Sequence, residues 1–389
     1  MTFEEDSSEK RSAGDFYLFH NFAAKRAGSP VLNVLSGADN VQLFHDSLMS
    51  AIAHTTLRQP PRDQDGNELR LVAGYLDKMI PNAMADHFEG RHYIAMNTAL
   101  FVAVQEFAMF CFTQQDFFPD VGDPSMEASP PPLDNRVPGL WLLDFTSHGG
   151  SVDEHHGRTI TPRGESRYNA SIYLGLLMAR FVWLHEFQHC FNGHVRLVQD
   201  TGRALYLNEI EEPLGLVGFQ APPMGDAGSR DAVQRSLELD ADKQAFWACC
   251  QIQLAQRENI EGIAALDINL RLRLTLFGAY AMTWLFEEFQ NYLDAKAGIT
   301  HPDPYLRLQN IVAIAARHIE PIHEAARAAN QDACGQFDTI QRNIPSIYAT
   351  DELRSGTANP EVQESLENYE KEFASVADEL ERLRYNEQR

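Results

Sequence analysis

The sequence FVWLHEFQH, from Phe181 to His189, indicates both a buried helix and the chemistry expected of this chain. It places His185 and His189 four residues apart, so a helix brings both imidazoles to one face, where they can bind one metal ion. Glu186 lies beside that face, where a carboxylate can act on a water molecule without binding the metal. The apolar residues before the motif predict a buried wall around the site.

A zinc site that performs hydrolysis uses three protein ligands and keeps a fourth position for water, so a third ligand is expected elsewhere. His194 comes nine residues after His185, half a turn out of phase on a continuing helix, and we expect it in a second layer around the metal. The pattern HExxHxxGxxH would require glycine and histidine where this chain has Asn192 and Val195, so that arrangement is not indicated.

Glu238, within LELDAD, is the stronger candidate for the third ligand. Asp242 follows it at i+4 on the same helix face, where its carboxylate can accept the outer N–H of a ligand histidine and fix the tautomer. In an acidic chain such residues are also typical of a solvated helix face. The presence of HExxH favours ligation by Glu238.

The order HExxHxxxxH and then, tens of residues later, ExxADxxA resembles the pattern of gluzincin metallopeptidases of the ImmA/IrrE and HtpX type. The matching positions are His185, Glu186, His189, His194, Glu238, Ala241, Asp242 and Ala245. The resemblance implies a zincin-like catalytic domain with three zinc ligands, His185, His189 and Glu238, and with Glu186 as general base. The chain is also similar in size and motif to Lit-type phage-exclusion peptidases.

A second segment, THPDPYLR from Thr300 to Arg307, resembles the HPxxxxR element of HtpX-like peptidases. If it faces the metal, His301, Tyr305 or Arg307 could donate a hydrogen bond to the oxyanion of a tetrahedral intermediate, and His301 is our catalytic candidate among them. The alternative is that His301 begins a turn and that Arg307 pairs with an acidic neighbour.

Composition and charge narrow the class of protein. The chain carries 55 acidic and 32 basic residues, a formal charge of -23, which repels nucleic acid and anionic lipid surfaces. Its five cysteines are odd in number and lack CxxC spacing, which indicates free thiols in a reducing cytoplasm. No targeting segment is recognisable at the N-terminus, and the apolar run Leu274–Phe286 is too short to span a bilayer.

Periodicity predicts a mainly helical α+β protein with a small sheet. The expected divisions are a disordered tail (1–14), a helical N-terminal region (15–117), a Pro-rich linker (118–138), a zincin-like domain (139–345) and a C-terminal amphipathic helix (346–389). Helical patterns cover Val41–Ile52, Leu69–Met79, Tyr93–Phe112, Ser171–Val198 with a break at Asn192-Gly193, Asp231–Gln256, Ile263–Ala295 and Leu306–Ile319. Leu140–Phe145 is expected to be a strand.

The C-terminal pattern repeats apolar residues at a 4-3 spacing over residues 362–383. Such a three-heptad helix either forms a homodimeric coiled coil or docks on the body of its own chain.

Taken together, these features predict a soluble cytoplasmic zinc metallopeptidase that hydrolyses a protein or peptide substrate, with a water molecule activated by Glu186. The alternative is a zinc-stabilised sensor or interaction protein in which the same ligands hold the fold without proteolysis.

Overall fold

The computed structural model is mainly helical, with one small sheet. The residues that it describes are 5–32, 39–56, 61–128, 138–141, 143, 160–202, 206–208, 227–255, 258, 267–292, 304–322, 324–341, 344 and 360–386. The expectation of a mainly α, α+β protein is confirmed at this level. Within these residues, no helix is both long and apolar enough to cross a membrane.

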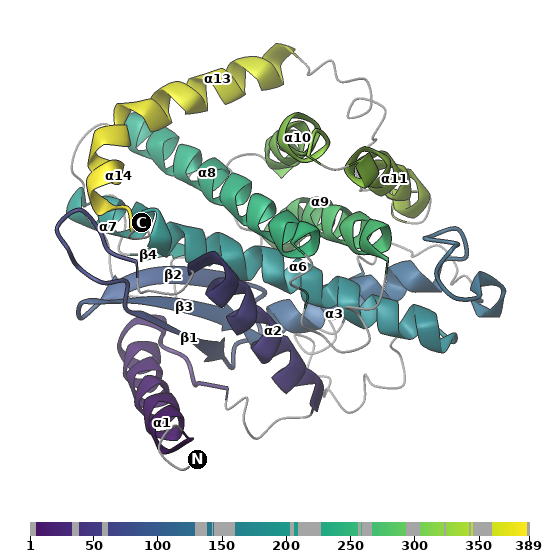
Figure 1. Ribbon diagram of the computed structural model, residues 1–389, viewed down its shortest axis with the longest axis horizontal. Helices are drawn as coiled ribbons and strands as arrows, with labels where there is room; N and C mark the ends of the chain where they lie inside the picture. The colour runs from purple at the N-terminus through teal and green to yellow at the C-terminus, as the bar shows by residue number, and fades with distance from the viewer. Residues whose placement is uncertain are drawn as a thin grey trace.

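Helix α6 (Glu165–Phe191), which carries the HExxH stretch, runs through the centre of the molecule (Figure 1). Nearly every side chain of α6 from Ala170 to Cys190 is buried, because neighbouring helices contact it on several sides. The elements that pack on it are α2 (Asp39–Thr56), α3 (Thr98–Thr113), α8 (Ala227–Leu254) and α9 (Ile268–Tyr292). A helix that is apolar all round is stable only in such a position.

A second layer of helices packs on α9. It consists of α10 (Pro304–Ile314), which continues into a π-helical turn at Ala315–Ile319, and of α11 (Glu324–Gln341). The helices expected around Asp231–Gln256, Ile263–Ala295 and Leu306–Ile319 are therefore present, with ends that differ by a few residues.

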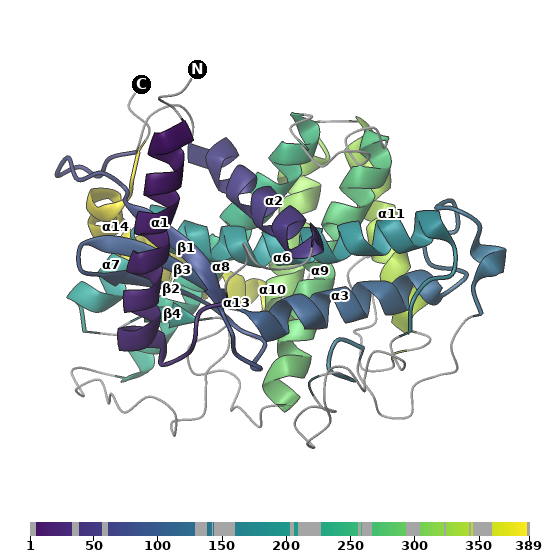
Figure 2. The ribbon, with the colours of Figure 1, turned by 90° about the horizontal axis from the view of Figure 1, so that it is seen from below.

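The sheet has the strand order β1-β3-β2-β4, with β1 (Leu71–Leu76) parallel to β3 (Arg91–Asn97). Strands β2 (Ala83–Phe88) and β4 (Tyr206–Asn208) are antiparallel to their neighbours. One face of the sheet packs on α6, and α1 (Glu5–Phe22) lies across the other face (Figure 2). The sheet therefore holds the C-terminal half of α6 from one side.

Of the helices predicted in the N-terminal region, the one over Leu69–Met79 is wrong, and the one over Tyr93–Phe112 is wrong in its first residues. Residues 71–76 form β1, and residues 91–97 form β3 before α3 begins at Thr98. Tyr93, Ile94, Ala95 and Met96 are all buried, because the sheet is covered on both faces. A strand of this kind gives a continuous apolar run that periodicity cannot distinguish from a buried helix.

Three smaller predictions also differ from the observed structure. Helix α1 begins at Glu5, inside the range expected to be a disordered tail. Residues 118–128 of the expected linker pack on the body, with Phe118 fully buried. In the expected strand Leu140–Phe145, Trp141 and Leu143 are helical and Leu140 lies in a bend, while the other positions lie outside the described residues.

The expected break at Asn192-Gly193 is present. Helix α6 ends at Phe191, Gly193 adopts a left-handed conformation with φ of 79°, and α7 (His194–Asp200) follows. A side chain at position 193 would meet Leu383 at 2.6 Å, so the close approach of the C-terminal segment also requires glycine here.

The C-terminal pattern forms two helices rather than the single one expected. Helix α13 (Pro360–Ser375) and helix α14 (Ala377–Leu383) are separated at Val376, whose side chain turns into the core. Helix α13 packs along α8, and α14 packs on α7 (Figure 1). Residues 362–383 therefore contact the body of their own chain through α7 and α8.

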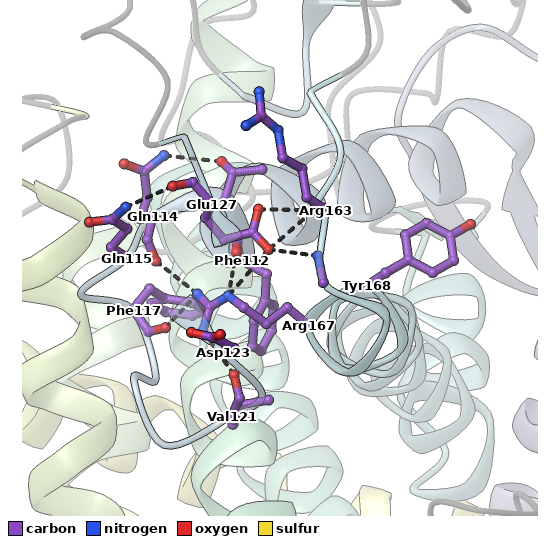
Figure 3. A network of polar contacts seen from close by, with 12 residues as sticks. Phe112, Gln114, Gln115, Phe117, Val121, Asp123, Glu127, Arg163, Arg167 and Tyr168 are labelled. Atoms are coloured by element: carbon purple, nitrogen blue, oxygen red, sulfur yellow. Dashed lines mark hydrogen bonds and ion pairs between the residues drawn. The ribbon is translucent and has the colours of Figure 1, made fainter. Parts of the chain in front are cut away.

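Arg167 attaches the N-terminal half of α6 to the segment that follows α3 (Figure 3). Its guanidinium is fully buried and donates hydrogen bonds of 2.8–3.1 Å to five backbone carbonyl oxygens. The carbonyls belong to Phe112, Gln114, Phe117, Phe118 and Val121. Glu127 lies 3.8 Å away, accepts hydrogen bonds from two backbone N–H groups before α6, and supplies the opposite charge.

Replacing Arg167 with methionine should lower the free energy of unfolding by roughly 3–5 kcal/mol, because five carbonyls and one carboxylate would lose a buried donor. Denaturant unfolding measures this change. The exposed Arg163, which uses only its backbone N–H in this network, is the control, and Arg163→Met should stay close to wild type. A similar loss in both variants would contradict the role given to Arg167.

Candidate metal centre

Helices α6 and α8 bring three ligand-type side chains together in the core. His185 and His189 come from successive turns of α6, and Glu238 comes from α8, which packs along it. All three side chains are at most 1% exposed. His185, His189 and Glu238 form a buried group that could hold a metal ion.

The three donor atoms form a small triangle. The two Nε2 atoms are 2.8 Å apart, and Oε2 of Glu238 lies 3.1 Å from Nε2 of His185 and 3.4 Å from Nε2 of His189. Tetrahedral zinc with bonds of about 2.0–2.1 Å requires ligand atoms about 3.3 Å apart. The two distances to Glu238 are close to this spacing, and the donor set of two imidazole nitrogens and one carboxylate oxygen could hold a metal ion.

Asp242, one turn after Glu238, sets the tautomer of His185. Its Oδ1 lies 2.9 Å from Nδ1 of His185, and a carboxylate can only accept, so we assign the proton to Nδ1. Nε2 then presents its lone pair to the centre. Arg307 on α10 donates two hydrogen bonds of 2.8 and 2.7 Å to Asp242. Burial opposes ionisation, but the Arg307 guanidinium holds the pKa of Asp242 below its usual range.

His194, the first residue of α7, sets the tautomer of His189 in the same way. Its Nε2 lies 3.4 Å from Oδ2 of Asp240, and its Nδ1 lies 3.1 Å from Nδ1 of His189. With the proton of His194 on the side of the carboxylate, Nδ1 of His189 donates and its Nε2 lone pair also faces the centre. Burial, partly offset by the charge of Glu238, lowers the pKa of His189 to about 4, so this imidazole is neutral at pH 7.

The C-terminal segment supports this second layer. Asn192 donates to Asp240 at 3.2 Å, and Arg384 donates two hydrogen bonds of 3.1 and 3.0 Å to Oδ1 of Asn192. The backbone N–H of Tyr385 donates to the carbonyl of Phe191 at the end of α6. Residues that are almost two hundred positions apart therefore fix the end of the helix that carries the histidines.

Glu186 lies on α6 between the two histidines and is 1% exposed. After burial, its negative charge is the largest contribution to the raised pKa of the Cys190 thiol, which places the carboxylate charge in the same part of the core. Cys190 itself is a free, buried thiol.

The structure brings together five of the side chains predicted from the sequence, namely His185, His189, Glu238, Asp242 and His194. Glu186 lies on α6, the helix that carries the two ligand-type histidines. His301 lies outside the described residues. Arg307 pairs with Asp242, and the hydroxyl of Tyr305 accepts a hydrogen bond from Gln309.

Sequence reasoning missed the parts played by Asp240, Asn192 and Arg384. Asp240 was visible only as one more acidic residue between Glu238 and Asp242. No local pattern connects Arg384 with Asn192, because the two are far apart in the chain and meet only after folding.

Comparison with known proteins identifies no relative of this chain: no family model, curated protein or solved structure matches it.

Asp242→Asn should weaken Zn²⁺ binding by roughly 10–100-fold, because an uncharged amide holds the imidazole of His185 less firmly and lowers its basicity. Competition with a chelating zinc indicator measures the dissociation constant. Asp332→Asn is the control, because Asp332 pairs with Arg273 on another part of the surface and should leave zinc affinity unchanged. Equal affinities for all three proteins would refute the role given to Asp242.

Proposed function

We propose that this chain is a zinc-dependent metallopeptidase that hydrolyses peptide bonds in a protein or peptide substrate. His185, His189 and Glu238 bind the metal, Glu186 is the general base, and Asp242 and His194 orient the two imidazoles. The proposal includes a cytoplasmic location.

The observation that carries the proposal is the close approach of two imidazole nitrogens and one carboxylate oxygen in the core. The two Nε2 atoms lie 2.8 Å apart and lie 3.1 and 3.4 Å from a carboxylate oxygen, while the Nδ1 atoms of the same rings lie 2.9 Å from Asp242 and 3.1 Å from His194. Three electron-rich atoms this close repel one another in a buried site unless a cation lies between them. A divalent cation with N and O ligands satisfies all three.

Zinc bound there would polarise the scissile carbonyl and lower the pKa of a water molecule toward 7. Glu186 would act as the general base that accepts a proton from the attacking water. The same carboxyl would then return that proton to the amide nitrogen as the C–N bond breaks. Because the carboxylate lies in a dry core, its charge acts on the proton with little screening.

The remaining parts of the proposal are supported by composition and by the cysteines. All five cysteines are free and buried, which suits a reducing compartment. A net charge of -23 disfavours nucleic acids and anionic membranes as partners and favours a neutral or basic target segment.

One observation favours a second candidate, a zinc-stabilised sensor or interaction protein without proteolytic activity. Every ligand of the centre, and Glu186 as well, is almost completely buried, as in sites where zinc holds the fold. Against this, a purely structural site has no use for a buried general base next to its ligands. The two candidates differ in what Glu186 contributes.

Glu186→Gln should abolish hydrolysis, with a loss of about 10²–10⁴-fold, and leave zinc bound, because the amide keeps the shape of the side chain but cannot accept the proton. New peptide termini, read by mass spectrometry after incubation with a mixture of unfolded proteins, measure the activity. Elemental analysis measures the zinc.

The control is Glu165→Gln, which changes an exposed glutamate in the first turn of the same helix and should cleave like wild type. Cleavage that persists in Glu186→Gln would contradict the mechanism. Zinc-loaded wild type that generates no new termini would contradict the peptidase and favour the sensor.

A further inference from the structure

A polar cavity that shares no lining residue with the metal centre lies beside α7. It has a volume of about 530 Å³, within the range of small-molecule sites. Its walls come from the loop before β1, the β2–β3 turn, α7 and the C-terminal segment at Tyr385.

The lining of this cavity is strongly basic for so acidic a chain. Arg62, Arg70 and Arg196 all line it, with Glu68 as the one carboxylate among its lining residues. The whole sequence has 55 acidic and only 32 basic residues, so three arginines around one cavity oppose the general composition. Even after pairing with Glu68 and Asp63, the three arginines leave a local excess of positive charge, which favours an anion.

The three guanidinium groups keep the capacity to bind a further acceptor. Arg62 pairs with Glu68, and Arg196 pairs with Asp63 at 2.6 Å, so two charges are offset. Within the described part of the chain, the exposed Arg70 side chain makes no ion pair. Each guanidinium carries five N–H donors, so the paired arginines still have N–H groups for a bound anion.

The walls of the cavity are held in place before any ligand arrives. Asp63 accepts hydrogen bonds from the backbone and side chain of Asn67, at 2.8 and 2.9 Å, and closes the loop. The backbone of Arg62 exchanges two hydrogen bonds with Asn386, and the hydroxyl of Tyr385 lies 3.1 Å from Nε2 of His92. A preorganised site loses less entropy on binding.

Two glycines leave the cavity open at its edge. Gly66 and Gly90 have φ of 83° and 73°, and a Cβ atom at either position would have no heavy atom within 4 Å. Backbone turns without side chains let a ligand approach the arginines closely.

We propose that this cavity binds the phosphate group of a small molecule, held by Arg70 together with the free donors of Arg62 and Arg196. Phosphate is favoured over a single carboxylate because guanidinium forks from two elements can each bind a different pair of its oxygens. A small molecule is favoured over a lipid headgroup because the cavity is lined by polar side chains and the net charge repels anionic membranes. The proposal is independent of the metal centre.

The test uses inorganic phosphate as the probe, in isothermal titration calorimetry at low ionic strength. The full-length wild type should bind one phosphate per chain, and Arg70→Ala should weaken binding by about tenfold, as expected for loss of a charge-assisted hydrogen bond. Arg70 is exposed, so its removal should leave the fold intact. Arg327→Ala, which removes an exposed arginine of α11, is the matched control and should bind like wild type.

Two further binding experiments, one with acetate and one with lipid vesicles, test the class of ligand. Acetate should bind at least about tenfold more weakly than phosphate, because it presents one pair of oxygens. Vesicles of phosphatidylcholine with phosphatidic acid should not compete with phosphate.

The absence of saturable phosphate binding would overturn the proposal. So would equal affinity in Arg70→Ala, which would place the anion elsewhere, including at bound zinc. Acetate binding as tight as phosphate, or vesicle binding that depends on Arg70, would overturn the assigned ligand class.

Discussion

Two imidazole nitrogens and one carboxylate oxygen lie within 3.4 Å of one another in the core. Such a triangle is stable when a cation occupies it, because three electron-rich atoms in a medium of low dielectric repel one another. Helix α6 supplies two of the atoms at i and i+4, and α8 supplies the third. The close packing of these two helices is therefore as much a requirement of the centre as of the hydrophobic core.

The described polar residues next to the two imidazoles hold these rings in one orientation. The outer nitrogen of His185 faces Asp242, whose charge is offset by Arg307 from α10, and the outer nitrogen of His189 faces His194. The C-terminal segment then fixes the end of α6 through Arg384 and Tyr385. Helix α10 and the segment that follows α14 thus support the centre without contributing one of its three ligand-type side chains. The helices packed around α6 therefore also hold the HExxH motif in place.

The sequence predicted what local spacing can encode. The i, i+4 relations of His185–His189 and Glu238–Asp242 and the break at Gly193 follow from helix geometry and from one left-handed residue. Strands β1 and β3 were missed because both faces of the sheet are covered, by α6 and α1, which removes the alternation that marks a strand. The division of the C-terminal helix at Val376 and the contact of Arg384 with Asn192 depend on docking, about which a heptad pattern carries no information.

Metal content per purified chain, measured by elemental mass spectrometry, shows whether His185, His189 and Glu238 bind zinc. Wild type should contain one zinc ion per chain, and both His189→Ala and Glu238→Ala should lose it, because each removes one corner of the triangle. The two variants test α6 and α8 separately. Wild-type protein that purifies without metal and cannot be loaded with zinc would contradict a zinc site formed by His185, His189 and Glu238. Full zinc content in either variant would contradict it as well.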